Sequence, residues 1–251
     1  MRVAAVIVAD EPAGWRDAGF AVGDDGVCRI GTVDIRLVGR GSPTTTGERD
    51  DVIRAWELTH PGGTAAGVSA AGTATADALV ADGLATTLVD DATVAATGRP
   101  PVAHPNGCLR IDHLVILTPD LDRTTAALGT LGVVPRQTRE AGRRRDGTVT
   151  LQRFFRLGEV IIEVVGPAEP TGSGPSRFWG LAHVVADLEA TVAGLGSNVS
   201  AARAAVQPGR HIATLRHPGV SVPTALMSAE PDRPVAGDDA GGTRGNHEGG
   251  R

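Results

Sequence analysis

The feature that most constrains this chain is an internal repeat. The segment CRIGTVDIRLVG at residues 28–39 aligns without a gap with FRLGEVIIEVVG at residues 155–166. Both copies predict a strand, a tight turn made of an arginine, an apolar residue and a glycine, and then a second strand. Self-similarity of this kind indicates a fold that is assembled from repeated modules.

A strand and a helix precede each copy. Residues 111–117 are apolar and β-branched, in a run that is long enough for one strand and too short for a helix. The Thr-Pro-Asp segment that follows ends this strand, and Asp120 can cap the helix that we predict over residues 121–131. Residues 3–8, followed by Asp10, repeat this arrangement near the N-terminus.

Three further strands complete the later module. We predict them over residues 133–137, 149–156 and 160–165, with a polar, arginine-bearing loop between the first two. The order of elements is βαβββ, and the fold class is therefore α+β.

The alignment of the two modules separates scaffold from chemistry. His113 opens the first strand of the later module, and Glu163 lies inside its last strand. In the first module Val3 takes the place of His113, and Arg36 takes the place of Glu163. The first module is thus expected to have the scaffold without these two polar groups.

Pattern and composition divide the chain into two halves and a tail. The predicted regions are a degenerate N-terminal half at 1–91 with modules at about 1–40 and 51–91, a linker at 92–108, a C-terminal domain at 109–228 and a disordered tail at 229–251. Within the second module, strands over residues 52–58 and 84–89 flank a helix predicted over residues 74–81. The small, polar stretch at residues 62–73 is expected to be a loop.

Two motifs mark the ends of the C-terminal module. His113 is followed seven residues later by Asp120 and Leu121, and Glu163 lies in an apolar closing strand. This pattern resembles the vicinal oxygen chelate superfamily of glyoxalase-like and bleomycin-resistance-like proteins over roughly residues 109–228. The resemblance implies a glyoxalase-like fold in which repeated βαβββ modules form half-open sheet cups.

The resemblance also implies roles for two residues. In the family, the positions of His113 and Glu163 lie on neighbouring strands, point into one cup and bind a metal, and Glu163 is also the expected catalytic residue. A neutral imidazole and a carboxylate suit divalent iron, manganese, nickel or zinc. No organic cofactor is implied. By itself a histidine at a strand end is more often a packed residue, so the pair carries this interpretation.

Two other ligand positions of the family are lost. Counting back seven residues from Asp187 gives Gly180, and the closing strand has Thr224 at the carboxylate position. His183 lies three residues after Gly180, so strand alternation places it on the opposite face, as a packed histidine. With two protein ligands left, we expect one divalent metal to be held weakly, with water or substrate completing its coordination.

The remaining candidates line the expected cup. Val115 shares a strand face with His113, Arg153 occupies a strand position, and Phe178 and Trp179 precede the fourth module as an aromatic lip. The predicted substrate-binding residues are Val115, Arg153, Phe178, Trp179, Gly180 and Thr224.

Charge and hydropathy exclude several partners. The formal net charge is −5 and no basic stripe offsets it, which argues against nucleic acid. No apolar run approaches membrane-spanning length, and no signal peptide is recognisable. We therefore expect a cytoplasmic protein, a monomer or a homodimer, that binds a small molecule and no membrane.

Two classes of function remain open. One is an enzyme that acts on a substrate with vicinal oxygens. A glyoxalase-like lyase or isomerase fits better than an extradiol dioxygenase, which needs ligands at His113, Gly180 and Thr224. The other is a non-catalytic, drug-sequestering binding protein with a degenerate metal site.

Overall fold

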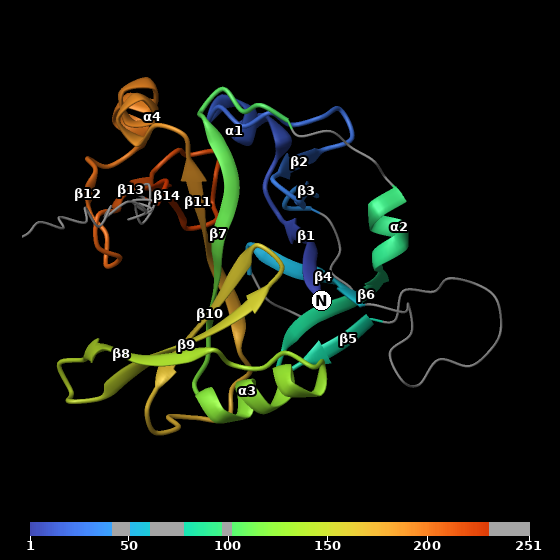
Figure 1. Ribbon diagram of the computed structural model, residues 1–251, viewed down its shortest axis with the longest axis vertical. Helices are drawn as coiled ribbons and strands as arrows, with labels where there is room; N and C mark the ends of the chain where they lie inside the picture. The colour runs from blue at the N-terminus through green and yellow to red at the C-terminus, as the bar shows by residue number, and fades with distance from the viewer. Residues whose placement is uncertain (42–50, 61–77, 97–101, 231–251) are drawn as a thin grey trace, which may run out of the picture.

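The structure is a computed structural model that describes residues 1–41, 51–60, 78–96 and 102–230. Two mixed β-sheets form its two halves (Figure 1). The N-terminal sheet has six strands in the order β2-β3-β1-β4-β6-β5, and the C-terminal sheet has eight in the order β12-β13-β14-β11-β7-β10-β9-β8. The predicted tail and the predicted loop at residues 62–73 lie outside the described residues, apart from 229 and 230.

Helices and strands have the following bounds. The N-terminal half contains β1 (Arg2–Val8), α1 (Pro12–Asp17), β2 (Val27–Ile30), β3 (Val33–Leu37), β4 (Ile53–His60), β5 (Ala78–Ala81), β6 (Leu84–Asp90) and α2 (Asp91–Ala96). The C-terminal half contains β7 (Cys108–Leu117), α3 (Leu121–Thr130), β8 (Gln137–Arg143), β9 (Val149–Leu157), β10 (Val160–Pro167), β11 (Arg177–Val185), α4 (Leu188–Leu195), a short 3-10 turn (Gly196–Asn198), β12 (Arg203–Ala204), β13 (His211–Leu215) and β14 (Thr224–Ser228).

The two sheets share one pairing pattern. In the N-terminal half β1 pairs in parallel with β3 and antiparallel with β4, which pairs in parallel with β6. In the C-terminal half β7, β10, β11 and β14 repeat these pairings in the same order. The expected α+β fold of repeated modules is confirmed.

The repeated turns lie where the halves meet. Gly31 and Gly158 have φ values of 60° and 64°, which favour glycine. A Cβ atom on Gly31 would lie 2.6 Å from a carboxylate oxygen of Glu159, and one on Gly158 would lie 2.6 Å from the Cβ of Arg2. The Glu159 carboxylate also accepts hydrogen bonds of 2.6 Å from the backbone N–H and the hydroxyl of Thr32. Both turn glycines are thus favoured by their φ, and Gly158 is also required by the close approach of the Arg2 Cβ from the opposite half.

Helix capping agrees with the sequence in the C-terminal half and differs in the first module. Asp120 accepts a hydrogen bond of 2.9 Å from the Arg123 N–H at the start of α3. Asp10, by contrast, is not a cap, because α1 begins after Glu11. The buried Asp10 carboxylate instead accepts hydrogen bonds from the Trp15 indole and from the backbone of Ser221, and so joins the two halves.

One predicted helix was wrong. The helix predicted over residues 74–81 is instead the strand β5 where the structure describes it, at residues 78–81. The signal missed was the Asp82-Gly83 pair, whose φ values of 50° and 91° form the tight turn of a β5–β6 hairpin. The helix α2 at residues 91–96 spans the boundary between the predicted second module and the linker.

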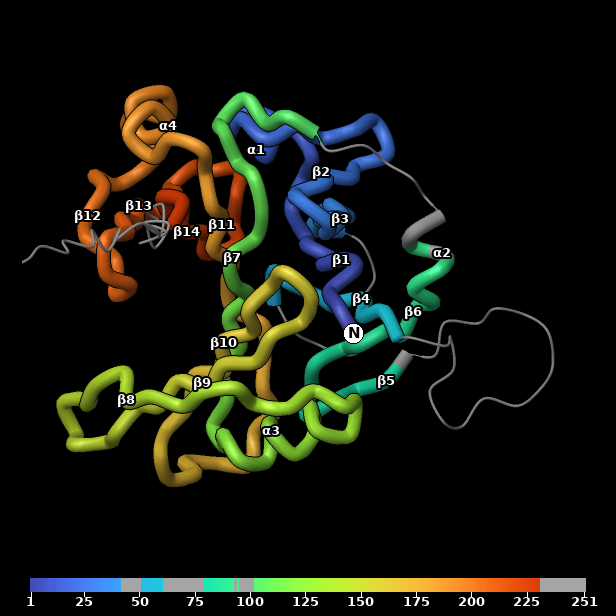
Figure 2. The backbone as a smooth tube through the Cα atoms, viewed as in Figure 1, coloured from blue at the N-terminus to red at the C-terminus, as the bar shows by residue number. Residues whose placement is uncertain are grey.

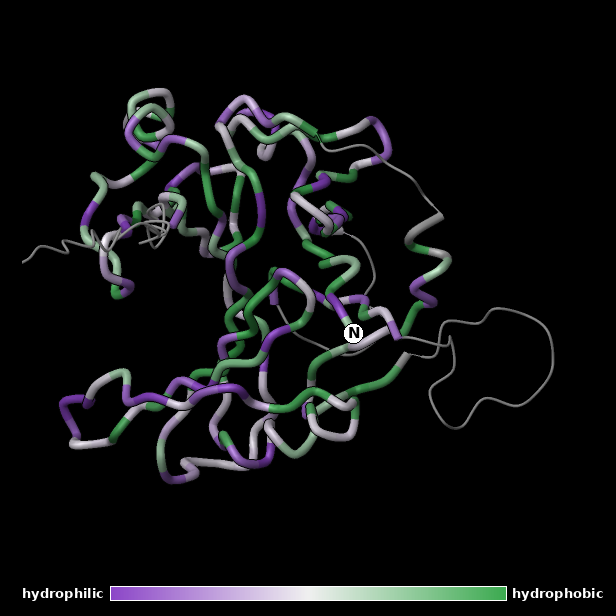
Figure 3. Tube along the Cα trace, in the orientation of Figure 1, coloured by the Kyte–Doolittle hydropathy of each residue, from purple (hydrophilic) through white to green (hydrophobic). Residues whose placement is uncertain are grey.

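The strand predicted over residues 133–137 was also misplaced. The observed strand β8 starts at Gln137 and extends through much of the predicted arginine loop. It is the outermost strand of its sheet and is exposed on both faces, so it has no apolar alternation to reveal it. Figure 3 shows hydrophilic residues along this edge of the sheet.

The core lies between the two sheets. Leu114 and Ile116 of β7 are buried in the same cluster as Val6 of β1. The Trp56 ring of β4 meets the Phe178 ring of β11 edge-on, with a centroid separation of 5.3 Å. Figure 2 shows the N-terminal segments on one side of β7 and β11 and the strands β12–β14 on the other. The face of β7 that carries His113 therefore points away from the N-terminal half.

Among the described residues, no helix is long and apolar enough to cross a membrane.

Candidate functional site

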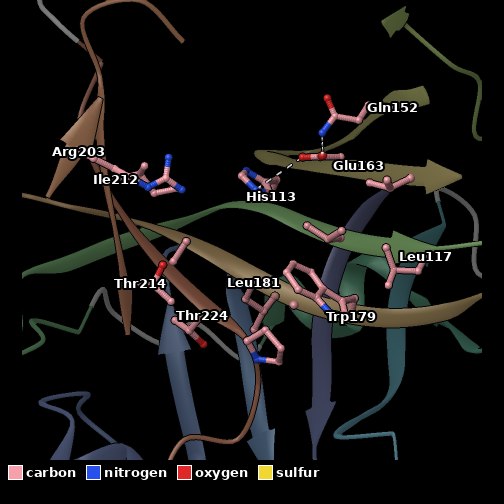
Figure 4. Close-up of a pocket in the computed structure, with 15 residues that line it drawn as sticks. His113, Leu117, Gln152, Glu163, Trp179, Leu181, Arg203, Ile212, Thr214 and Thr224 are labelled. Atoms are coloured by element: carbon pink, nitrogen blue, oxygen red, sulfur yellow. Dashed lines mark hydrogen bonds and ion pairs between the residues drawn. The ribbon is translucent and has the colours of Figure 1, made fainter. Parts of the chain in front are cut away.

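A cavity of about 530 Å³ lies against the C-terminal sheet, on the face that points away from the N-terminal half. His113, Val115 and Leu117, alternate residues of β7, form its floor. Gln152 of β9 and Glu163 of β10 lie on one side, and β11 to β14 provide the other (Figure 4).

The structure brings His113 and Glu163 together. In the parallel ladder between β7 and β10, Val115 is the direct partner of Glu163, and His113 is the partner of Ile161, so both polar side chains lie on the cavity face. His113 Nε2 is 3.7 Å from Glu163 Oε2, too far for a hydrogen bond and close enough for both atoms to reach one ion or one water.

Two further side chains orient the Glu163 carboxylate. The Gln152 amide N–H donates to Glu163 Oε1, and the Arg139 guanidinium donates to the Gln152 carbonyl oxygen at 2.6 Å. Because Arg139 has no acceptor to offer, it fixes which end of the Gln152 amide faces Glu163. Oε2 of Glu163 is thereby left for His113 and for the cavity.

On its other side His113 contacts Asp112. The His113 Nδ1 is 2.9 Å from Asp112 Oδ2, and Asp112 Oδ1 accepts a hydrogen bond of 2.9 Å from Arg210 Nη1. Burial raises the pKa of the Asp112 carboxyl. The hydrogen bond from His113 and the charge of Arg210 together outweigh burial and lower this pKa to about 2. Asp112 is therefore ionised at neutral pH.

Gly180 and Thr224 reach the cavity without offering a ligand. A Cβ atom on Gly180 would lie 2.5 Å from the carbonyl oxygen of Pro223, so this position has no room for a side chain. The buried Thr224 hydroxyl donates to the Val222 carbonyl at 2.8 Å. Across the sheet, His113 lies in one row with Ala182 and Ala225. Thr224 pairs with Leu181 and therefore lies in the adjacent row. Thr224 and Ala225 both line the cavity, and Ala225 is the one that shares the row of His113, one residue after the position that we assigned to the lost ligand.

Two of the expected substrate-binding residues lie elsewhere. The Arg153 guanidinium points to α3, where it donates to Asp122 at 2.9 Å and to Thr125 at 2.7 Å. Phe178 packs in the core between the sheets, because a register shift between Phe178 and Gly180 leaves Trp179 to face the cavity. Trp179 is 45% exposed there.

His183 is packed, as the spacing argument predicted. It is fully buried and lies edge-on to Trp15 and Phe20, with ring centroids 6.4 and 5.5 Å away. Neither of its ring nitrogens has a hydrogen-bond partner among the described residues. Burial lowers the pKa of His183 to about 3, and the nearby His104 and His113 act in the same direction.

Sequence reasoning missed four polar residues of this site: Asp112, Arg139, Gln152 and Arg203. Gln152 could have been predicted from the sequence, because alternation along β9 puts Gln152 on the face opposite to Arg153. Arg203 comes from the two-residue strand β12, which pairs only through two positions and has no recognisable pattern. Arg203 lines the cavity, and no ion pair between described residues involves it.

A comparison with known families finds a match in this half of the chain. Residues 112–214 match the model of the Glyoxalase/Bleomycin resistance protein/Dioxygenase superfamily. The match lies within the C-terminal half and covers less than half of the chain, so this part of the protein is similar to the superfamily. The resemblance drawn from His113 and Glu163 is thereby confirmed.

Solved structures share the fold of this chain over both halves. A mutant of 4-hydroxymandelate synthase from Streptomyces coelicolor is 12% identical, with a TM-score of 0.53 over 92% of this chain and 93% of that one. A fusion protein of a xylose isomerase-like TIM barrel with 4-hydroxyphenylpyruvate dioxygenase is 14% identical, with a TM-score of 0.54 over 90% of this chain and 48% of that one. These likenesses show a shared fold.

Methylmalonyl-CoA epimerase from Mycobacterium tuberculosis is 18% identical, with a TM-score of 0.38 over 50% of this chain and 91% of that one. No curated protein sequence matches the chain.

Members of the superfamily often use a divalent metal, and the donor set decides how this chain can hold one. His113 and Glu163 face one point and are ligand types that suit such an ion. Within the described part of the chain, no group of three or more His, Cys, Asp or Glu residues could bind a metal. These residues therefore fit an open site, in which water or substrate supplies the remaining ligands, and they do not fit a closed structural site.

Proposed function

We propose that the C-terminal sheet forms a cup that binds a small molecule with adjacent oxygen atoms, and that His113 and Glu163 act on it as in a glyoxalase-like enzyme. The observation that carries this proposal is the His113–Glu163 pair, 3.7 Å apart on one face of a 530 Å³ cavity. This volume lies within the roughly 300–1,000 Å³ of small-molecule sites.

The lining of the cup indicates the kind of ligand. Val115, Leu117 and Val165 form an apolar floor, and Trp179 forms an exposed aromatic wall. The polar groups of the pair lie on one side, whereas Arg203 comes from β12 at the far edge of the sheet (Figure 4). A mainly apolar molecule with oxygens near His113 and an anionic group near Arg203 fits this arrangement.

Within this cup Glu163 is the proton carrier. Gln152 holds Oε1, so Oε2 is free to take a proton from a substrate carbon next to a carbonyl group. The electrons of the broken C–H bond move to the carbonyl oxygen. Where the first carbon bears a hydroxyl group, Glu163 returns the same proton to the former carbonyl carbon and the hydroxyl proton passes to the former carbonyl oxygen, which completes an isomerisation that needs no further reactant. A divalent metal bound by His113 and Glu163 would polarise the two substrate oxygens.

A second candidate is a binding protein that uses the same cup without catalysis. It is favoured by the loss of two ligand positions, since Gly180 has no room for a side chain and Ala225 has no donor.

Proton exchange in D₂O distinguishes the two candidates. NMR would follow deuterium uptake beside the carbonyl of small α-hydroxy and α-oxo acids and hemithioacetals. We expect uptake with the wild type, a loss of at least about 100-fold in Glu163→Gln, and no change in Glu189→Gln, an exposed residue of α4. Ligand-dependent quenching of Trp179 fluorescence without any exchange would contradict the enzyme and support the binding protein.

Metal titration tests the open site separately. Calorimetry with Mn²⁺ on protein purified without chelator should show weak binding that His113→Ala abolishes. His183→Ala should leave this affinity unchanged and alter stability alone, because its ring is buried away from the cup. Binding that survives His113→Ala would contradict the assignment of the ligands.

A further inference from the structure

Asp112 occupies an irregular position in β7. Next to β11, Ile111 pairs with His183, and His113 pairs with the adjacent residue Ala182. Between these two pairs β7 has one residue, Asp112, that has no partner in β11. Asp112 is therefore the extra residue of a β-bulge. In a regular strand, Asp112 and His113 would point to opposite faces. The bulge is what lets the Asp112 carboxylate reach the His113 ring.

Both oxygens of this carboxylate have a defined partner. Oδ2 accepts from His113 Nδ1 at 2.9 Å, and Oδ1 accepts from Arg210 Nη1 at 2.9 Å. Arg110 Nη1 lies farther from Oδ1, at 3.5 Å. Asp112 and Arg210 are only 2% and 5% exposed. The carboxylate is therefore held in one place by groups that water barely reaches.

Arg210 is itself fixed by the backbone. Its Nε and Nη2 donate to the Ser228 carbonyl at 3.1 and 3.0 Å. Ser228 is the last residue of β14, so Arg210 ties the far side of the sheet to the bulge in β7. A chain of contacts thus runs from the β14 backbone through Arg210 and Asp112 to His113.

We propose that Asp112 is a positioning residue that keeps the hydrogen of the His113 imidazole on Nδ1 and presents the bare Nε2 lone pair to the cup. A carboxylate can only accept, so the ring nitrogen that it contacts must carry the hydrogen. Nε2, 3.7 Å from Glu163 Oε2, is then the only ring nitrogen with a lone pair for an ion or a proton. The role given to Nε2 rests on the proposed function, whereas the tautomer does not.

The tautomer can be read directly by NMR. Long-range ¹H–¹⁵N correlation at about pH 8, where ordinary imidazoles are neutral, distinguishes the two ring nitrogens. The His113 signals among the 7 histidines are identified by their loss in His113→Gln. We expect the metal-free wild type to carry the hydrogen on Nδ1.

The decisive variant is Asp112→Asn combined with Arg210→Gln. Removing both charges avoids leaving the Arg210 guanidinium buried without its carboxylate, which would strongly destabilise the fold. We expect this double variant to stay folded by circular dichroism, to lose the pure Nδ1–H tautomer, and to bind Mn²⁺ about 10- to 100-fold more weakly. Arg210→Gln alone keeps Asp112 beside Arg110, whose Nη1 is 3.5 Å from Oδ1, so it should remain folded by circular dichroism and retain the tautomer.

The proposal is overturned if the double variant keeps the Nδ1–H tautomer, or if Arg210→Gln alone loses it to the same extent. Failure of the proposed function looks different. Absence of Mn²⁺ binding by the wild type would contradict the metal role of His113, while the tautomer readings would still decide the role of Asp112.

Discussion

The two sheets of this protein have the same pairing pattern and different chemistry. With the repeated turns superposed, Arg36 corresponds to Glu163, and its strand partner Ile7 corresponds to Val115. His113 then corresponds to Ala5, two residues from the Val3 that the sequence alignment indicated. The alignment used Asp10 as an equivalent helix cap, and the structure shows that Asp10 is no cap.

On the equivalent face of the N-terminal sheet, the charged side chains pair with each other. Arg36 forms an ion pair with Glu57 of β4, whose counterpart in the C-terminal sheet is Ala182. In the C-terminal sheet the partner of His113 on β11 is Ala182, which has no charged group to pair with, and Glu163 faces the cavity. One pairing pattern thus supports a closed ion pair in one half and an open polar pair in the other, as expected when function resides in side chains grafted on a fold.

The bulge belongs to the scaffold rather than to the site. In the N-terminal sheet the extra residue of β1 is Ala4, between Val3 and Ala5, which pair with Leu58 and Glu57. Ala4 is the counterpart of Asp112. A backbone irregularity present in both halves therefore acquires a role in only one of them, through a change of side chain.

The C-terminal sheet also has a strand beyond each end of the shared pattern. β8 contributes Arg139 and β12 contributes Arg203, and the described part of the N-terminal sheet has no counterpart of either. The added edges bring cationic side chains to the cup, and the shared strands supply the His113–Glu163 pair.

The largest effect that we predict within this comparison concerns the core. Leu58 of β4 is the counterpart of His183, and both are fully buried. The folded-state pKa of His183 is about 3, below the usual value of about 6.5 in an unfolded chain. Between these values the unfolded chain binds more protons, so stability falls as the pH falls.

His183→Leu should remove this dependence. Relative to the variant, the wild type should lose on the order of 3 kcal/mol of unfolding free energy between pH 7 and pH 4. Urea unfolding at pH 7, 5 and 4 measures the difference, and the exposed His211→Leu serves as a control. Parallel pH profiles of the wild type and His183→Leu would contradict the assignment.

The next effect tests the register of the fourth module. Ala225 lies in the row of His113 and Ala182, whereas the buried Thr224 lies in the row of Leu181, so Ala225→Glu should supply a third ligand and tighten Mn²⁺ binding about tenfold or more. Thr224→Glu should bury an unpaired carboxylate and lower the melting temperature without tightening Mn²⁺ binding. Calorimetry and thermal melts of both variants measure this. The reverse result would restore the sequence-based assignment.

The smallest effect concerns the added edge strand. Arg203→Gln should weaken the binding of anionic ligands by several-fold to about tenfold, and less at high salt, because the guanidinium is exposed. Affinities for a carboxylate ligand and for its neutral amide, read from Trp179 fluorescence, measure the effect. Arg216→Gln, an exposed arginine just after β13, is the matched control. Equal losses for the acid and the amide would show that Arg203 does not bind the charge.

The sequence by itself determined the modules and the face of β7. The repeat around Gly31 and Gly158 fixed two hairpins, because a tight turn with positive φ leaves a local signature. Alternation placed His113 with Val115 and set His183 apart, because the side-chain period of a strand is two. These are short-range properties that a chain carries in adjacent residues.

Only the tertiary structure decided what surrounds His113. Asp112 contacts it through a bulge that depends on pairing with β11, and Arg210 arrives from a position 98 residues later in the chain. That Ala225 rather than Thr224 shares the row of His113 is likewise set by the register with β11 and not by local pattern. Register between strands distant in sequence is a packing outcome, and one residue of slip exchanges the cup face for the core face.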